Sequence, residues 1–180
     1  YDYNKLWEWS ISSPKEFWNI LLKYLSIKFY QIDSEIISND TEIVNQKFFT
    51  NTKLNYAENI LLSLNKEPII FRNEKGYKET LSKQDVLNKV RKASNYFRSI
   101  GIKKNDRVAA VAANVPNTII SFLAVNSIGA IWTSCSPDFG VSAMLDRFGQ
   151  VEPTILLYSS SYLYGGKHID IREKIKKASQ

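Results

Sequence analysis

Cysteine and histidine are almost absent from this sequence, with one of each among 180 residues, Cys135 and His168. A single cysteine cannot form an internal disulfide, which fits a reducing compartment, and we therefore expect a cytoplasmic location. One cysteine and one histidine are also too few to assemble a zinc site from the usual ligands. Because Cys135 follows an apolar run, we expect a small buried thiol and not a nucleophile.

Long apolar runs are missing as well, and no stretch approaches the roughly 18 to 20 apolar residues of a membrane-spanning helix. We therefore expect no membrane partner. The sequence begins at Tyr1 without a basic and then apolar leader, although trimming would remove such a segment. Basic residues outnumber acidic ones by 24 to 18, but they are scattered and bunch only at Lys174–Lys177. We therefore expect no nucleic-acid partner.

The clearest structural signal lies between Asp106 and Pro153. Residues 108–113 are small and apolar, which is typical of a strand covered on both faces. Pro116 suits the first turn of a helix, and Gly129 suits its C-terminal cap. A second strand over 130–134 completes a βαβ unit, whose crossover should be right-handed. The pattern predicts an α/β fold with a mostly parallel sheet flanked by helices.

The segments around this unit extend the α/β pattern. Short strands over 68–71 and 77–80 predict a hairpin, and Ser82–Asp85 reads as a capping box for the helix that follows. A helix over 141–151 and a strand over 154–158 are predicted next.

Nearer the N-terminus, residues 1–12 are rich in aromatic side chains and are predicted to be irregular. Ser13–Glu16 reads as a second capping box, with Pro14 as the first helical residue. No repeat, low-complexity stretch or clear linker separates these segments from the rest.

Two short motifs resemble known nucleotide-binding motifs, but neither matches its motif in full. Gly165-Gly166-Lys167 lacks the first glycine of the Walker pattern, where Ser161 stands, and His168 takes the place of the serine or threonine. Asp138-Phe139-Gly140 spells a kinase triplet without the other kinase motifs. We interpret residues 165–167 as a turn before a last basic, amphipathic helix.

Several stretches together resemble the acetoacetyl-CoA synthetases, a branch of the adenylate-forming acyl-CoA ligases close to acetyl-CoA synthetase. They run in register along nearly the whole chain: Leu54–Asn59, Asp106–Ala109, Ile128–Trp132, Ser134–Gly140 and Asp146–Phe148. Within the family, residues 135–140 favour the acetoacetyl over the acetyl branch. The resemblance implies an N-terminal fragment of such a ligase. Residues 1–65 would be its N-terminal extension, helical in character, and residues 66–180 the incomplete beginning of the AMP-binding ligase domain.

In this family, a carboxylate attacks Mg-ATP to give an acyl-adenylate, and the CoA thiol then displaces AMP. The resemblance therefore implies acetoacetate, ATP and CoA as small-molecule substrates and Mg²⁺ as a cofactor. The family's phosphate loop, its adenine and ribose motifs and its C-terminal lysine lie beyond the part that this chain resembles. We accordingly expect no catalytic and no metal-binding residue here, the remainder of the ligase chain as a partner, and neither half-reaction from the chain alone.

Two segments match family positions that border the nucleotide end of CoA. They are Ser136, Pro137, Asp138 and Phe139, and Tyr164, Gly165, Gly166 and Lys167. Glycines let the backbone approach a phosphate, and a lysine supplies charge. Acetyl-CoA synthetases have arginine at the position of Tyr164 and glycines near Pro137, which leaves Lys167 as the leading candidate. An acetyl- or propionyl-CoA synthetase fragment and a non-catalytic nucleotide-binding or interaction module remain as alternatives.

Overall fold

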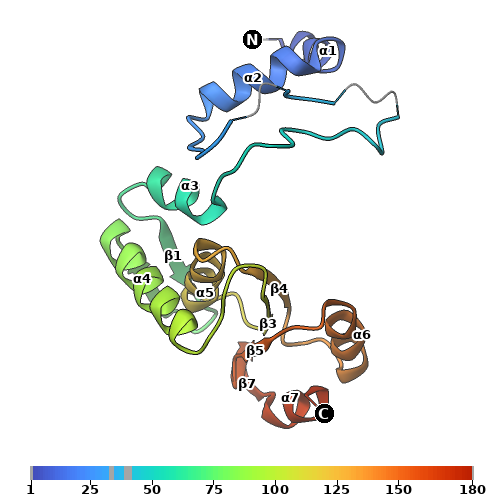
Figure 1. Ribbon diagram of the computed structural model, residues 1–180. Coiled ribbons are helices and arrows are strands. Elements are labelled where there is room, and N and C mark those ends of the chain that lie inside the picture. The colour runs from blue at the N-terminus through green and yellow to red at the C-terminus, as the bar shows by residue number, and fades with distance from the viewer. Residues whose placement is uncertain (1, 33–34, 39–41, 180) are drawn as a thin grey trace. The chain divides into compact units, whose positions relative to one another are not determined.

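The computed structural model describes residues 2–32, 35–38 and 42–179. The chain divides into two compact units, residues 1–55 and residues 56–180, which are taken separately below (Figure 1). No helix in the described ranges is long and apolar enough to cross a membrane.

The N-terminal unit, residues 1–55, begins with two helices, α1 (Tyr3–Ser12) and α2 (Pro14–Tyr24). The prediction of an irregular start is therefore wrong, because the Asp2 carboxylate accepts a hydrogen bond from the Asn4 N–H at 3.0 Å and caps α1. Pro14 is the first residue of α2 as predicted.

The predicted capping box of α2 is also wrong, since the Ser13 side chain caps nothing. Glu16, its expected partner, instead accepts a hydrogen bond from the indole N–H of Trp9 at 3.2 Å.

The rest of this unit is held by a few long-range contacts. Two isolated antiparallel bridges join Gln31 to Lys53 and Ile37 to Phe48. Aromatic rings meet edge to face from Trp9 through Phe17 and Trp18 to Phe48, with centroids 5.3, 5.6 and 5.8 Å apart. Among the described residues of the unit, Ile37 alone is a buried hydrophobic side chain.

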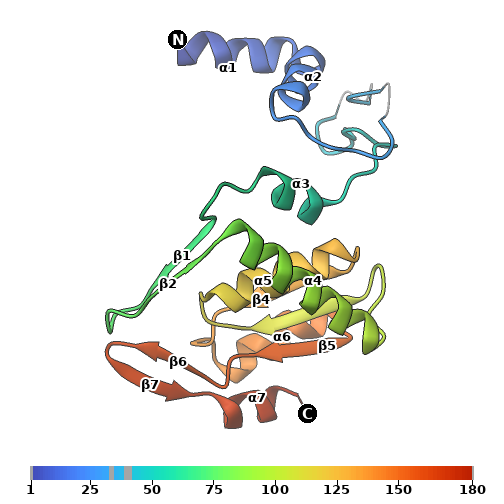
Figure 2. The same cartoon turned by 90° about the vertical axis from the view of Figure 1, so that its left-hand side faces the viewer.

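The second unit, residues 56–180, contains a parallel sheet of three strands in the order β4-β3-β5. The strands are β3 (Arg107–Val111), β4 (Ile131–Cys135) and β5 (Ile155–Tyr158), with Val108 of the central strand level with Trp132 and Ile155. The helices α5 (Pro116–Ser127) and α6 (Val141–Val151) make the crossovers. The predicted α/β class is confirmed, as Figure 2 shows.

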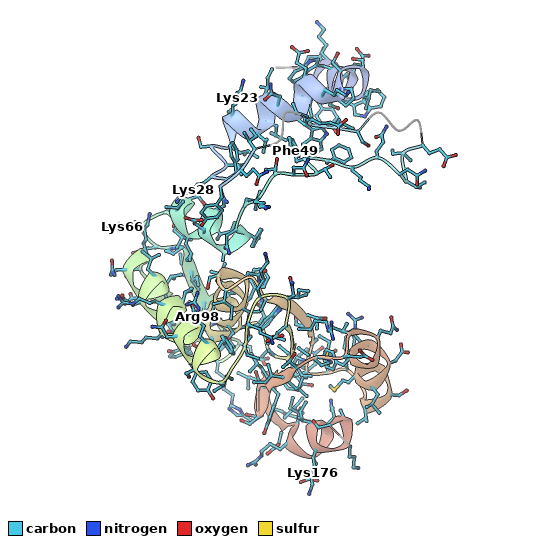
Figure 3. The ribbon with its side chains drawn as sticks, in the orientation of Figure 1. Lys23, Lys28, Phe49, Lys66, Arg98 and Lys176 are labelled. Atoms are coloured by element: carbon cyan, nitrogen blue, oxygen red, sulfur yellow. The ribbon has the colours of Figure 1, made fainter. Side chains whose placement is uncertain are left out.

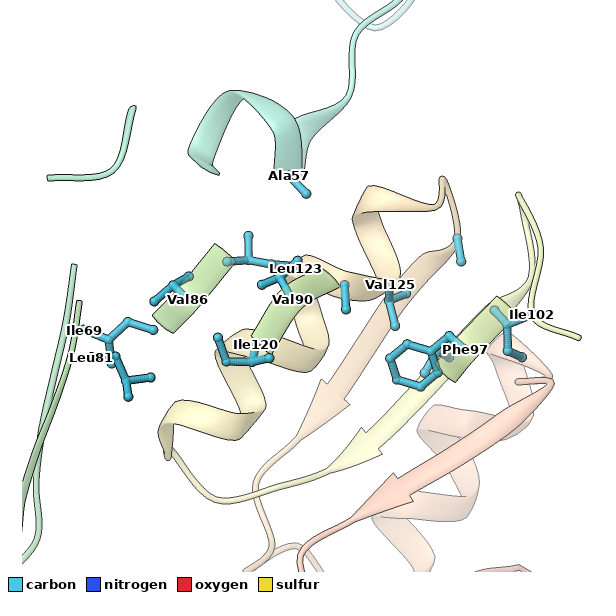
Figure 4. Packing of buried hydrophobic residues seen from close by; sticks show 13 residues of the cluster. Ala57, Ile69, Leu81, Val86, Val90, Phe97, Ile102, Ile120, Leu123 and Val125 are labelled. Carbon is cyan, nitrogen blue, oxygen red and sulfur yellow. The ribbon is translucent and has the colours of Figure 1, made fainter. Parts of the chain in front are cut away.

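Helices cover both faces of this sheet. On one face lie α3 (Tyr56–Ser63), α4 (Lys83–Ser99) and α5, around a cluster that contains Val108, Leu123 and Phe97 (Figure 4). On the other face α6 and α7 (Arg172–Ala178) pack on Ala109 and Val111 of β3, and Met144 of α6 belongs to the same cluster. Alternate residues of β3 thus enter opposite clusters, as a buried parallel strand requires. Cys135 is buried at the end of β4, as predicted, and burial raises the pKa of its thiol.

Two hairpins complete the second unit. The predicted one forms from β1 (Ile69–Arg72) and β2 (Lys78–Leu81), and the Ser82–Asp85 capping box of α4 is present in full. The other, β6 (Ser161–Tyr164) and β7 (Lys167–Asp170), was expected only as a turn. Its Gly165 and Gly166 have φ values of 57° and 75°, which a two-residue type I′ turn needs.

Candidate functional site

A hollow of about 770 Å³ opens at the carboxyl ends of the parallel strands. The segments that follow β3, β4 and β5 form its floor, through residues 113–115, residues 136–138 and Ser159. The two hairpins form its walls, with Phe71, Arg72, Asn73, Glu74 and Tyr77 on one side and Ser161, Tyr162, Leu163, Tyr164 and His168 on the other. The carboxyl edge of a parallel sheet is where open α/β folds place their ligands.

The loop after β4 brings three of its four predicted site residues to this hollow: Ser136, Pro137 and Asp138. Pro137 is buried, and its carbonyl oxygen accepts a hydrogen bond from the Lys174 ammonium of α7 at 2.9 Å. Hydrogen bonding from the Ser136 hydroxyl, and then from the backbone N–H of Asp138, holds the pKa of the Asp138 carboxyl below its usual range. The loop is therefore held by α7 through Lys174 and by the hydrogen bonds within residues 136–138.

Phe139, the fourth predicted residue of that loop, lies elsewhere. Its ring packs against the cluster under α6 and α7, and the Arg147 guanidinium stands 5.2 Å from the ring centroid. Phe139 is not among the lining residues of the hollow.

The four predicted residues at the β6–β7 turn also lie partly in the lining of the hollow and partly outside it. Tyr164 lines the hollow, whereas Gly165, Gly166 and Lys167 are exposed at the tip of the hairpin and are not part of the lining. Tyr164 pairs with Lys167, and Leu163 pairs with His168. Of Lys167 and His168, only His168 lines the hollow.

The tips of the two hairpins are joined by a hydrogen bond. The Gly166 N–H donates to Oε2 of Glu74 at 3.0 Å, across 92 positions of sequence. The Asn73 side chain accepts from the N–H groups of Lys75 and Tyr77, both at 3.0 Å, and so fixes the turn that presents Glu74. Figure 2 shows the two tips side by side.

Three charged side chains, Arg72, Glu74 and Asp138, and the imidazole of His168 line the hollow. Both carboxylates are engaged, Glu74 by Gly166 and Asp138 by Ser136. Within the described ranges no hydrogen bond or ion pair holds the side chain of Arg72 or His168. The hollow therefore offers free cationic or donor groups beside an apolar wall, where the rings of Phe71 and Tyr77 lie 6.2 Å apart.

Sequence reasoning missed Arg72, Glu74 and His168 as site residues. The turn at Asn73–Gly76 was a visible signal for a hairpin, but nothing local indicates that its tip meets a second hairpin. Elsewhere in the second unit, Lys66 and Arg98 lie apart from each other, as Figure 3 shows. No three His, Cys, Asp or Glu side chains gather into a possible metal site in the part of the chain that the structure describes.

Two family models match the chain, "AMP-binding enzyme" over residues 63–180 and "Acetyl-coenzyme A synthetase N-terminus" over residues 3–60. The chain is 34% identical over 180 residues to an acetoacetyl-coenzyme A synthetase of Rhizobium meliloti (strain 1021), covering 99% of this chain and 28% of that protein. It is 35% identical to an acetoacetyl-CoA synthetase of Xenopus tropicalis, covering 97% of this chain and 27% of the relative.

A malonamoyl-CoA synthetase of Penicillium aethiopicum is 32% identical, with 92% of this chain and 24% of that protein covered. Among solved structures, an acetoacetyl-CoA synthetase from Streptomyces lividans superposes with a TM-score of 0.92 at 28% identity, covering 99% of this chain and 28% of that one. The chain thus spans about a quarter of the length of these relatives.

Proposed function

The chain belongs to the AMP-binding enzyme family, and from this we propose that it is the N-terminal part of an acetoacetate–CoA ligase. Such a ligase activates acetoacetate with ATP to an acyl-adenylate and pyrophosphate, and then transfers the acyl group to CoA with release of AMP. The observation that carries the proposal is the likeness to acetoacetyl-CoA synthetases along 97 to 99% of the chain, in sequence and in fold.

The proposed domain boundaries follow the matched segments. Residues 1–65 would be the N-terminal extension, and residues 66–180 the beginning of the ligase domain. The family matches over residues 3–60 and 63–180 support this boundary, and so does the separation into compact units at residue 55. The remainder of the ligase chain would be the partner of both, and the reaction would take place in the cytoplasm.

ATP and Mg²⁺ would be held by that remainder, because the family's ATP motifs lie beyond the part that this chain resembles. CoA is the one substrate for which this chain has candidate contacts, at the nucleotide end. Ser136, Pro137 and Asp138 would form the floor of its site and Tyr164 part of the wall. Gly165, Gly166 and Lys167 would form the charged tip, and Phe139 the support behind the loop. These residues bind and orient, and none of them is placed to break a bond.

Replacing Lys167 by Ala in the complete ligase tests the CoA site. We expect the apparent KM for CoA to rise about fivefold, because one cationic contact to a phosphate is lost. The ATP–pyrophosphate exchange rate should stay near normal, since the first half-reaction does not involve CoA. Lys176→Ala, which removes an equally exposed charge on α7, is the control. Unchanged CoA dependence in Lys167→Ala would remove Lys167 from the site.

The chain on its own should release no pyrophosphate from ATP and acetoacetate, because its part of the family carries none of the ATP motifs. A pyrophosphate assay with the purified 180-residue chain checks this, and measurable release would contradict it. Binding of ATP by this chain in calorimetry would favour a stand-alone nucleotide-binding module instead. A concentration-dependent oligomer without nucleotide affinity would favour an interaction module.

A second candidate for the acyl substrate comes from the malonamoyl-CoA synthetase relative, which is nearly as similar as the acetoacetyl-CoA synthetases. Comparing kcat/KM of the complete ligase for acetoacetate, malonamate, acetate and propionate distinguishes these substrates. The proposal expects acetoacetate to give the highest value.

A further inference from the structure

We propose that Lys174 of α7 and Arg147 of α6 are positioning residues, which hold the loop at residues 136–139 in the conformation that accepts CoA. Neither side chain lines the hollow, so both would act through the loop and not by contact with the ligand. The proposal rests on the proposed function for the identity of the ligand. The restraints themselves do not depend on it, because they are contacts within the second unit.

The loop forms a tight turn with proline inside it. The Phe139 N–H donates to the carbonyl oxygen of Ser136 at 3.3 Å, which places Pro137 at the first central position, where proline is favoured. The turn's own hydrogen bond does not use the Pro137 carbonyl, and a buried carbonyl needs a partner. Pro137 is buried, and its carbonyl oxygen accepts from Nζ of Lys174 at 2.9 Å. The turn therefore depends on α7 for this hydrogen bond.

Lys174 stands on the packing face of α7. Positions spaced by three and four residues share one face of a helix, and here they carry Ile171, Lys174, Ile175 and Ala178. The two isoleucines are buried in the cluster under α6 and α7, and Ala178 packs against it. Lys174 is half-buried, whereas the other lysines of α7 are exposed. A lysine at such a position is costly unless its ammonium has a partner, and the Pro137 carbonyl is that partner.

Arg147 restrains the other end of the loop. Its guanidinium carbon stands 5.2 Å from the centroid of the Phe139 ring, within the range of a cation–π contact. The ring itself packs against the same buried cluster. Phe139 directly precedes Gly140, the N-cap of α6, and Arg147 lies further along that helix. Arg147 therefore fixes the point where the loop enters α6.

These restraints bear on the ligand because residues 136–138 form the floor of the hollow. Without Lys174, the Pro137 carbonyl would be buried without a partner, and the loop would regain one only by moving towards water. Only molecules with the loop in place are competent, so the apparent affinity for the ligand falls in proportion to their fraction.

The test uses the complete ligase with Lys174→Met, which keeps the length of the side chain and removes its donor. We expect the apparent KM for CoA to rise about fivefold, which corresponds to a competent fraction of about one fifth. Saturating CoA restores the loop, so kcat should change little, and ATP–pyrophosphate exchange should stay near normal because it does not involve CoA. Arg147→Gln should raise the KM only about twofold, since an exposed cation–π contact is weaker than a hydrogen bond to an ammonium.

Three further variants separate positioning from a merely structural role. Lys174→Arg restores a charged donor and should bring the KM for CoA back towards that of the wild type. Lys177→Met removes an exposed charge from the same helix and should leave the KM unchanged. Ile175→Val loosens the packing of α7 but keeps the loop contact, so it should lower the melting temperature and leave the KM unchanged.

A measurement without ligand tests the restraint itself. The Phe139 amide donates within the turn, so its hydrogen exchange reports whether the loop stays in place. We expect exchange at this amide to be faster in Lys174→Met than in the wild type, and unchanged in Lys177→Met.

An unchanged KM in Lys174→Met, no recovery in Lys174→Arg, or an equal rise in Ile175→Val would overturn the positioning role and leave the ligase proposal in place. A wild-type ligase that did not use CoA would refute the proposed function, and the CoA role of Lys174 with it. Exchange at the Phe139 amide would still decide whether Lys174 holds the loop.

Discussion

The two units of the chain contain similar side chains but are stabilised in different ways. In the second unit, apolar residues from β3, α4, α5 and α6 enter two clusters on either side of a parallel sheet. In the first unit, α1 and α2 bury no residue, and Trp7 remains 53% exposed. Aromatic and apolar composition therefore does not by itself predict burial, because burial requires a second layer to pack against.

The second unit gives the largest expected effect in a matched pair on α6. Met144 is fully buried, whereas its neighbour Leu145 is 47% exposed. We expect Met144→Ala to lower the free energy of unfolding by about 3 kcal/mol, because it leaves a cavity in the α6–α7 cluster. Leu145→Ala should change it by less than about 0.5 kcal/mol. Urea unfolding followed by circular dichroism measures both values, and equal costs would mean that this cluster does not organise the unit.

Sequence reasoning worked best where the determinant was local. The bounds of α6, Val141–Val151, were predicted to the residue, and Pro116 and Gly129 marked α5 correctly because a ring-locked φ and a left-handed cap have few other uses. The Ser82–Asp85 box was readable for the same reason. The strands were displaced by one or two residues, since an apolar run does not specify where its ladder ends.

The predictions that failed depend on contacts between different elements. The analogous capping pattern at Ser13–Glu16 did not form, and Glu16 instead accepts a hydrogen bond from the indole of Trp9 on the preceding helix. The β6–β7 hairpin was reduced to its glycine turn, as its four-residue strands have no clear alternation. At the candidate site, the loop and turn positions came from family resemblance, whereas the meeting of Glu74 with Gly166 depends on two segments 92 positions apart.

The two capping patterns give a second, smaller test of the comparison. Ser82→Ala should cost about 1 kcal/mol of stability, since the Ser82 hydroxyl accepts the Asp85 N–H at 3.2 Å and caps α4. Ser13→Ala should have no effect, because its hydroxyl caps nothing. Thermal unfolding of both variants measures this, and an equal loss in Ser13→Ala would contradict the difference between the units.

The Ser82 cap also carries a pH dependence. Hydrogen bonds from the Ser82 hydroxyl and N–H lower the pKa of Asp85 in the folded state. The carboxylate therefore contributes its full stabilisation above its unfolded pKa and loses it as the pH falls through the lowered folded value. The stability difference between wild type and Ser82→Ala should accordingly shrink in acid, which unfolding curves at several pH values will show.

The smallest effect is expected in the first unit, where aromatic contacts take the place of a core. The Phe17 ring lies 5.3 Å from Trp9 and 5.6 Å from Trp18, each edge to face, and Phe17→Leu keeps the apolar bulk while removing both ring contacts. An edge-to-face contact is worth at least about 0.5 kcal/mol, and because leucine recovers part of the packing we expect a net loss of about 0.6 kcal/mol, which corresponds to about a threefold change. We expect amide hydrogen exchange in α1 and α2 to accelerate about threefold and exchange in β3 to stay unchanged, because the parallel sheet belongs to the other unit. Faster exchange in β3 would show that the two units share a folding core, and would contradict the view that they are stabilised separately.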